Sequence, residues 1–208
     1  MPTQILLQSV AKRYRHEWIF SGLDYTFERG CSYAVTGANG SGKSTLLRML
    51  CGHLSPTRGT LSFRSDGKVL SIEELCSRIS YAAPYIELVE EFTLSETLDF
   101  HRRFQPFRDG IRPSDIMDRL GFARSTAQKE VRFFSSGMKQ RLKLALALLS
   151  DTPVVLLDEP TTNLDRQGVE WYLTLIGSFV SDRLVVVASN VPEDYRFCDQ
   201  VLDLPAYK

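Results

Sequence analysis

The chain lacks several features that would assign a protein of its size to a specialised class. Its 208 residues carry 25 basic and 25 acidic side chains, so no basic field favours a nucleic-acid partner. No apolar run approaches the roughly 18 residues of a membrane span, and the longest, at 144–149, is far shorter. Residues 1–4 lack the basic and apolar regions of a signal peptide. We therefore expect no nucleic-acid binding, no membrane span and no secretion.

Cysteine is scarce and scattered. The four cysteines form neither a metal-binding spacing nor a disulfide framework, which suits a reducing cytosol. The apolar fraction, 43%, is ordinary for a globular protein, and the length is ample for a packed core. The composition therefore predicts one cytoplasmic domain over residues 1–208.

A glycine-rich motif, G-x-x-x-x-G-K-[ST], occupies residues 37–44. A strand-like run at 31–36 precedes it and a helix-like run at 44–50 follows it, which is the context of a phosphate-binding loop. The glycines let several backbone N–H groups point at one anion, and the helix adds its positive N-terminal end. In such a loop Lys43 reaches the β- and γ-phosphates and Ser44 ligates Mg²⁺. The residues expected at the phosphates are Gly37, Asn39, Gly40, Ser41, Gly42, Lys43, Ser44 and Thr45.

A second motif combines an apolar strand with two carboxylates. Residues 154–157 are apolar without alternation, which predicts a strand buried on both faces of a parallel sheet. Asp158 and Glu159 end this strand, where ligands bind in open α/β sheets. Because an acidic pair is costly to bury without a cation, Asp158 is the natural partner of Mg²⁺, directly or through water. Glu159 points elsewhere and can polarise an attacking water as general base.

Residues 134–141 lead into a strongly apolar helix at 142–149. Ser135 is a good N-cap residue, whereas Gly137 in the first turn is a poor helix former, costing about 1 kcal/mol relative to alanine. A helix start with small residues and exposed N–H groups can receive a phosphate. The same residues also fit a capped core helix, and their spacing alone does not separate the two interpretations.

A further buried strand is predicted at 184–188, followed by Ser189-Asn190. Three predicted strands are thus followed by segments that can bind or react with a polar ligand, which begin at Gly37, at 158–159 and at 189–190. A doubly wound sheet would bring these ends to one edge, which makes Asn190 a candidate for the same site. The alternative interpretation of Asn190 is that it only forms a turn.

The remaining sequence predicts the arrangement of subdomains. Residues 18–20 are a candidate strand, residues 23–28 alternate as a half-buried strand does, and Asp66-Gly67 between two strand-like runs predicts a hairpin. The fold class is therefore α/β, a P-loop NTPase with a mixed sheet core, an N-terminal antiparallel β subdomain and an inserted α-helical subdomain. The expected division is 1–83 and 151–208 for the ATPase core with its β subdomain, and about 84–150 for the helical subdomain.

In this order and spacing, the motifs resemble those of the ATP-binding subunit of an ABC transporter. The phosphate loop by itself indicates only a P-loop NTPase. The segment Ser135-Ser136-Gly137, leading into 139–141 and lying about twenty residues before the acidic strand, is typical of the ABC family. The loop at 163–165 also occurs in the family's order. The resemblance covers almost the whole chain.

This resemblance implies ATP and Mg²⁺ as cofactors and a head-to-tail pair of subunits, formed with itself or a homologous subunit. The signature residues of one subunit then cover the γ-phosphate bound by the other, and Asp165 lies in the interface loop. Tyr14 occupies the position of an aromatic that stacks on adenine, although it also fits a surface tyrosine among basic neighbours. The resemblance further implies a separate transmembrane permease subunit and a peripheral location on the inner face of the plasma membrane. The implied signature residues are Ser135, Ser136 and Gly137.

Three positions depart from the family pattern. Ser136 replaces a glycine of the signature, while Ser135 and Gly137 keep phosphate binding plausible. Pro84 stands where the family has a glutamine after the strand 79–81, and proline has no polar side chain for metal or phosphate. Asn190 replaces a histidine; its amide can donate a hydrogen bond but cannot be protonated.

The sequence therefore predicts a slow ATPase that powers a membrane transporter, an exporter, through nucleotide-driven dimerisation. The proposed catalytic residues are Glu159, Lys43 and Asn190, and the metal ligands are Ser44 and Asp158. Two alternatives remain open. One is a soluble ABC-type ATPase that remodels or regulates a complex without transport. The other is a module that senses ATP with little turnover, which the residues at 84 and 190 suggest.

Overall fold

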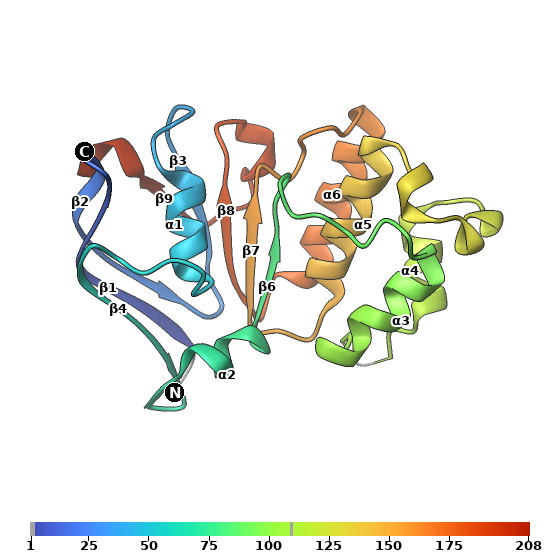
Figure 1. Cartoon of the computed structure of the whole chain (residues 1–208), viewed down its shortest axis with the longest axis horizontal. Coiled ribbons are helices and arrows are strands. Elements are labelled where there is room, and N and C mark those ends of the chain that lie inside the picture. Colours follow the sequence, from blue (N-terminus) through green and yellow to red (C-terminus); the bar gives the residue numbers. More distant parts are fainter. Residues whose placement is uncertain (1–2, 109) are drawn as a thin grey trace.

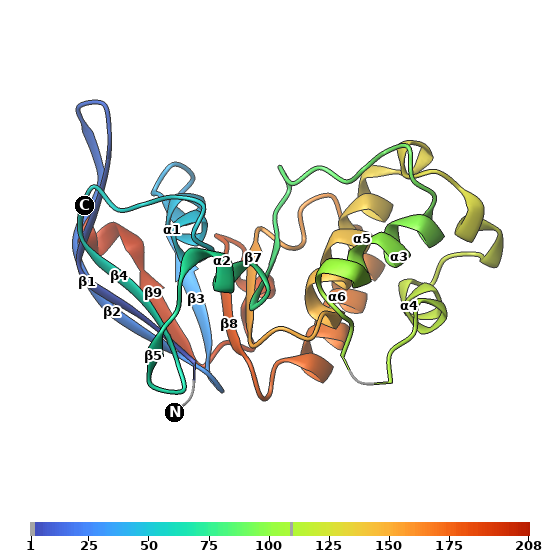
Figure 2. The ribbon, with the colours of Figure 1, turned by 60° about the horizontal axis from the view of Figure 1, so that its bottom comes forward.

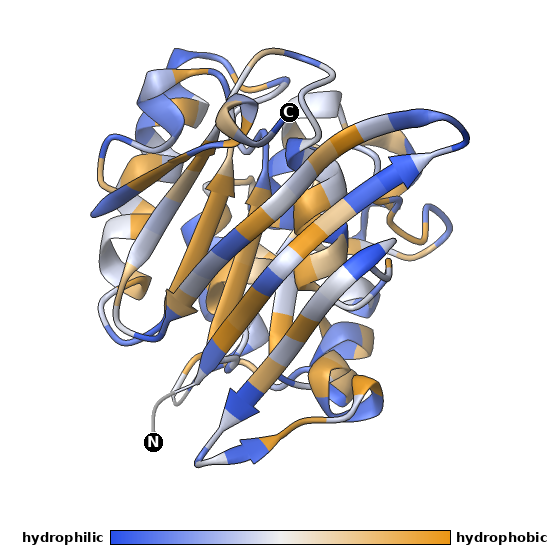
Figure 3. Ribbon diagram, turned by 90° about the vertical axis from the view of Figure 1, so that its left-hand side faces the viewer, coloured by the Kyte–Doolittle hydropathy of each residue, from blue (hydrophilic) through white to orange (hydrophobic). Residues whose placement is uncertain are grey.

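A computed structural model describes residues 3–108 and 110–208. An antiparallel sheet with strand order β2-β1-β4-β5 forms one side of the molecule (Figure 1). Apolar and polar residues alternate along its strands, so one face packs inward and the other meets solvent (Figure 3). Its strands are β1 Gln4–Tyr14, β2 Glu17–Glu28, β4 Arg58–Ser65 and β5 Lys68–Val69.

Strand β2 is continuous, whereas the sequence predicted two strands at 18–20 and 23–28. The interruption is a local irregularity: Val10 pairs with Leu23 but Lys12 pairs with Phe20, so the register shifts between them. Gly22 lies in this stretch with φ of 65°, a left-handed conformation that glycine adopts without strain. The chain therefore keeps one ladder across the bend instead of ending a strand. The predicted hairpin at Asp66-Gly67 forms between β4 and β5.

A second sheet has the strand order β6-β7-β8-β3-β9 and runs through the middle of the molecule (Figure 1). Its strands pair in parallel throughout the described residues, whereas the sequence predicted a mixed sheet. Each of these strands is reached through a crossover connection that returns the chain to the same end of the sheet. The antiparallel strands all gather in the other sheet. The parallel strands are β3 Ser32–Thr36, β6 Ile79–Ala82, β7 Val154–Asp158, β8 Leu184–Ala188 and β9 Gln200–Asp203.

Helices cover both faces of the parallel sheet, which explains why β8 is apolar at every position and β7 at every position before Asp158. Helix α1, Lys43–Leu50, lies between the two sheets, and its leucines share a core with Leu156 of β7. Leu157, the next residue, points to the other face and packs with α5 and α6. Both strands are buried along their whole length. The prediction of an α/β fold with an antiparallel β subdomain is confirmed.

The helical elements between β6 and β7 lie to one side of the sheets (Figure 2). Thr93 caps α3 through a capping box with Glu96, as their spacing predicts. No helix among the described residues is long and apolar enough to cross a membrane. The division of the chain at about 84 and 150 stays a prediction. The helices of this part are α3 Leu94–Phe104, α4 Pro113–Leu120, α5 Ser136–Leu149 and the 3₁₀ turns Arg124–Gln128 and Val131–Phe133; the remaining ones are α2 Ile72–Cys76, α6 Arg166–Phe179 and the 3₁₀ turns Pro192–Asp194 and Leu204–Tyr207.

A buried arginine joins the end of α5 to the start of β7. The Arg183 guanidinium is 1% exposed and donates to the carbonyls of Leu148, Ser150 and Thr152 at 2.6–2.9 Å. Desolvation by burial lowers the pKa of Arg183 to about 10, so the side chain stays charged at neutral pH. The guanidinium satisfies carbonyls at the C-terminal end of α5 that no helical partner reaches. This contact fixes the start of β7 and therefore helps to position the two carboxylates at the end of the strand.

Helix α3 carries a partly buried histidine that makes stability depend on pH. The His101 ring stacks on Phe107, its Nε2 lies 2.7 Å from Ser150 Oγ, and burial lowers its pKa to about 4. The unfolded chain takes up this proton near its ordinary pKa of 6.5, so stability is full above 6.5 and is lost as pH falls toward 4. Relative to His101→Gln, the wild type should lose on the order of 2 kcal/mol between about pH 7 and about pH 4.5. Urea unfolding of both proteins at each pH measures this difference; parallel pH profiles would contradict it.

Candidate active site

The carboxyl ends of three parallel strands meet at one edge of the sheet. Asp158 of β7 pairs with Ala188 of β8, and Ala188 pairs with Val35 of β3. The segments that follow these residues therefore lie side by side, as the sequence spacing led us to expect. Their contact is direct: Asn190 Nδ2 donates to Asn39 Oδ1 at 3.4 Å, although 151 positions separate them.

The phosphate loop requires glycine at two positions for reasons that the structure makes explicit. Gly42 has φ of 104°, and a Cβ on it would lie 2.4 Å from the Ile19 side chain. Gly37 has φ of 139°, and a Cβ on it would lie 2.7 Å from Ser41 Oγ. Any other residue would combine backbone strain with a clash. The loop therefore packs closely against the side chains around it at these two glycines.

Lys43 and the start of α1 make the loop electropositive. The Lys43 side chain is 5% exposed, and its ammonium donates to the carbonyls of Gly37 at 2.6 Å and Ala38 at 3.2 Å. Ser41 Oγ is buried, and no hydrogen-bond partner for it lies in the described part of the chain. Helix α1 begins after Gly42 without a side-chain cap, so its first N–H groups are free for an anion.

Asp158 lies beside Ser44 at the end of β7. The residue is 1% exposed, and Oδ2 accepts a hydrogen bond from the Tyr85 hydroxyl at 3.0 Å. Burial raises the pKa of the Asp158 carboxyl, and the neighbouring hydroxyls of Ser44 and Tyr85 act in the opposite direction. Oδ1 is buried and has no hydrogen-bond partner among residues 3–108 and 110–208. A buried carboxylate oxygen without a partner beside a serine hydroxyl fits Mg²⁺, which prefers oxygen ligands.

Glu159, the next residue, faces a different environment. Its φ of 44° is left-handed and uncommon outside glycine, and its amide donates to Ala188 O at 2.8 Å. This turn directs the half-buried carboxylate into a cavity of about 210 Å³ that the phosphate loop and Ile19 also line. Backbone strain of this kind persists where the surrounding structure enforces it, and it clusters at functional sites. The two carboxylates thus separate into a buried one and a cavity-facing one.

The segment Ser135-Ser136-Gly137 lies elsewhere. Ser135 caps α5, its Oγ accepting from the Met138 amide at 3.2 Å. These residues line a separate hollow of about 340 Å³ together with the loop at 163–165. Among residues 3–108 and 110–208, this hollow and the cavity at the phosphate loop have no lining residue in common. The signature segment and the phosphate loop would therefore face each other only across an interface with another subunit.

Two further predicted residues have local contacts. Asp165 caps α6 by accepting from the Gly168 amide at 2.7 Å and forms an ion pair with Arg141 at 3.7 Å. Tyr14 ends β1 with 45% of its surface exposed, and Lys12 Nζ lies 5.4 Å from its ring centroid. Neither contact tests the roles expected for these residues, which stay predictions.

Sequence reasoning missed a buried carboxylate beneath the site. Asp194 is 1% exposed and accepts from Ser189 Oγ and Thr161 Oγ1, each at 2.5 Å. It therefore ties the loop that carries Asn190 to the loop that follows Glu159. Desolvation raises the pKa of Asp194, and these two hydroxyls oppose the shift. Nothing in the local sequence marks Asp194, because its partners are distant or ordinary turn residues.

A phosphate loop between a parallel strand and a helix, facing an acidic strand end, defines a P-loop nucleotide-binding fold. The family model described as ABC transporter matches residues 20–162, and the chain belongs to that family. The chain is 31% identical to Nod factor export ATP-binding protein I of Ralstonia nicotianae, over 94% of this chain and 62% of that protein. It is 34% identical to daunorubicin resistance ATP-binding protein DrrA3 of Streptomyces coeruleorubidus, over 80% of this chain and 53% of that protein.

A solved structure shares the fold. It is a dimeric ATP-binding cassette in a post-hydrolysis state, bound to ADP and Pi, with a TM-score of 0.80 and 22% identity over 96% of this chain and 94% of that one. The chain spans less than two thirds of the length of the two curated relatives above. The likeness to the solved structure shows the fold, and the roles of the signature residues stay predictions.

Removing the Asp194 carboxylate should destabilise the edge of the site. In Asp194→Ala the buried Ser189 hydroxyl and the partly buried Thr161 hydroxyl lose their acceptor, so the free energy of unfolding should fall by about 2 kcal/mol. Its exposed neighbour gives the control: Glu193→Ala should change it by less than about 0.5 kcal/mol. Urea denaturation of the two variants and the wild type measures both values. Equal stabilities for the two variants would contradict a structural role for Asp194.

Proposed function

We propose that this chain binds Mg²⁺ and ATP, hydrolyses the nucleotide slowly, and uses the reaction to power a membrane exporter. The observation that carries the proposal is the cavity that Glu159 shares with the phosphate loop, beside the buried oxygen of Asp158. A phosphate loop alone would support nucleotide binding. The added pair of carboxylates, one suited to a metal and one facing the cavity, supports hydrolysis.

The roles follow from the geometry. The Lys43 ammonium, now held by loop carbonyls, lies where it can turn to β- and γ-phosphate oxygens. Ser44 and Asp158 would hold Mg²⁺, which when bound neutralises charge that develops on the phosphates. Glu159 would accept a proton from the attacking water, because its carboxylate faces the cavity rather than the metal corner. Tyr14 would stack on the adenine ring.

Hydrolysis requires a second subunit in this proposal. The signature residues Ser135, Ser136 and Gly137 line a hollow of their own at the N-terminus of α5, a favourable site for a phosphate. A head-to-tail pair would place this helix end over the phosphate loop of the partner, with Asp165 beside it. The solved cassette described above is dimeric, which supports the pairing. The partner is a second copy of this chain or a homologous subunit.

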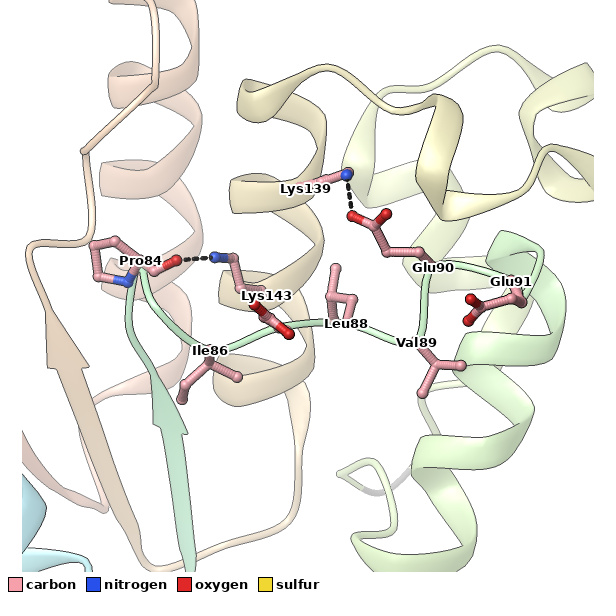
Figure 4. Close-up of a pocket in the computed structure, with 9 residues that line it drawn as sticks. Pro84, Ile86, Leu88, Val89, Glu90, Glu91, Lys139 and Lys143 are labelled. Atoms are coloured by element: carbon pink, nitrogen blue, oxygen red, sulfur yellow. Dashed lines mark hydrogen bonds and ion pairs between the residues drawn. The ribbon is translucent and has the colours of Figure 1, made fainter.

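The permease partner would contact a groove between the connection 84–91 and helix α5 (Figure 4). The groove has a volume of about 600 Å³ and is lined by three glutamates and two lysines, of which Glu90 and Lys139 form an ion pair. Val89 is 43% exposed there, so an apolar contact is available among charged side chains of both signs. The two curated relatives are named for export and drug resistance, which supports an exporter. The chain would then lie on the inner face of the plasma membrane.

Slow turnover is proposed because two positions lack their usual side chains. Pro84 has no polar group to offer the metal site. Asn190 is exposed and reaches Asn39 of the phosphate loop, so its amide can contact phosphate but cannot change charge. The same two residues favour a second candidate function, an ATP-sensing module with little turnover. Measured turnover separates the two.

Replacing the proposed base tests hydrolysis directly. Glu159→Gln keeps the size and polarity of the side chain but removes its proton acceptor, so steady-state ATPase should fall by about 100-fold or more. ATP should then accumulate bound, and light scattering should show a dimer with ATP and a monomer without it. Equal turnover in the variant and the wild type would refute Glu159 as base. A monomer at saturating ATP would count against the signature acting across subunits.

Restoring the missing histidine tests the origin of slow turnover. If Asn190 only partly stabilises the transition state, Asn190→His should raise kcat by about ten-fold, and Asn190→Ala should lower it. The affinity for ATP in the absence of metal should change little in either variant. A kcat unaffected by both substitutions would show that Asn190 does not limit turnover.

A further inference from the structure

We propose that Tyr85 is a positioning residue of the metal site, holding Asp158 so that its second oxygen faces Mg²⁺. This inference rests on the proposed function and assigns a role to a residue that no motif contains. Tyr85 follows Pro84, the position that has no polar side chain, in the connection between β6 and α3. The polar group that reaches Asp158 from this connection is thus the hydroxyl of Tyr85, one residue after Pro84.

In the hydrogen bond between Tyr85 and Asp158, only the tyrosine can be the donor. An ionised carboxylate only accepts, so the Tyr85 hydroxyl donates to Asp158 Oδ2 at 3.0 Å. That contact fixes the rotation of the carboxyl group and leaves Oδ1, the buried oxygen without a partner in the described residues, aimed away from Tyr85. The Tyr81 hydroxyl contacts the Tyr85 hydroxyl from the other side. Tyr81 can donate to Tyr85 while Tyr85 donates to Asp158, which completes a short chain of hydroxyls.

Burial does not explain where the Tyr85 ring lies. The side chain is 43% exposed, so little hydrophobic free energy holds it in place. The Arg48 guanidinium lies over the ring at 4.3 Å from its centroid. Arg48 is on α1, four residues after Ser44, and therefore projects from the same side of the helix that bears the serine. The ring is held between α1 and β7 by a cation–π contact and a hydrogen bond.

The backbone on the N-terminal side of Tyr85 is also fixed. Lys143 of α5 donates to the carbonyls of Pro84 at 2.9 Å and Ala83 at 3.3 Å, and Figure 4 shows it reaching Pro84. Burial lowers the pKa of Lys143, with the nearby Lys139 adding to the effect. Tyr85 thus lies at a point where α1, β7 and α5 are joined by side-chain contacts. Such outer contacts orient metal ligands and tune the affinity for the ion.

Tyr85→Phe tests the assignment, since it removes the hydroxyl and keeps the ring over Arg48. Titration of Mn²⁺, a spin-active substitute for Mg²⁺, into the full chain with saturating ATP measures the metal affinity. We expect the variant to bind Mn²⁺ about ten-fold more weakly, because loss of a ligand-orienting contact typically costs that much or more. Its affinity for ATP in the presence of EDTA should equal that of the wild type, which also verifies that the variant folds.

The matched control is Tyr25→Phe, whose hydroxyl donates to Gln200 at 3.3 Å near the opposite edge of the sheet. It makes the same chemical change and should leave the Mn²⁺ affinity as in the wild type. In the Tyr85 variant the Mg²⁺ concentration for half-maximal ATPase should rise about ten-fold while kcat at saturating Mg²⁺ stays near the wild-type value.

The outcomes separate this inference from the proposed function. If the wild type binds Mn²⁺ with ATP and Tyr85→Phe binds it equally well, the role of Tyr85 is refuted while the proposed function stands. If the Tyr85 and Tyr25 variants weaken binding equally, the role of Tyr85 is likewise refuted. A wild-type protein that binds neither ATP nor Mn²⁺ would overturn the proposed function and this inference with it.

Discussion

The structure depends above all on the parallel register of three strands. Asp158, Ala188 and Val35 lie in line across β7, β8 and β3, so the segments that follow these residues begin at one edge. A shift of one residue in any strand would turn its side chains to the opposite face and move its end by more than 3 Å. Complete burial of β7 and β8 and the contacts of Arg183 at the other end hold this register.

The edge that results contains features that destabilise the folded state. It holds a buried carboxylate oxygen and a buried Ser41 hydroxyl, neither with a partner in the described residues, and a left-handed Glu159. Each feature opposes folding, by about 1–3 kcal/mol for a lost hydrogen bond or a strained residue. All three lie at the carboxyl ends of β3 and β7 or in the segments that follow them. Their concentration at this edge is the physical argument for a nucleotide site, independent of the family match.

Much of this edge was predictable from sequence, because its main components are local. The phosphate loop is marked by glycines whose positive φ the structure confirms, and β7 by an unbroken apolar run that ends in two acids. Tyr85 and Asp194 were missed because their roles depend on tertiary contacts: Tyr85 meets Asp158 across 73 positions. The mixed sheet was a wrong detail, since strand direction depends on crossover connections that local patterns do not show.

The central claim is that this chain supplies two different halves of a composite site, and a mixing experiment tests it most directly. Lys43→Ala disables the phosphate loop, and Ser136→Asp places a negative charge where the partner's γ-phosphate would lie while remaining favourable at a helix start. Each variant alone should be inactive. An equimolar mixture should recover up to about a quarter of wild-type ATPase activity, because half of the dimers then contain one intact site of two. A mixture that stays at the background of the separate variants would contradict the account.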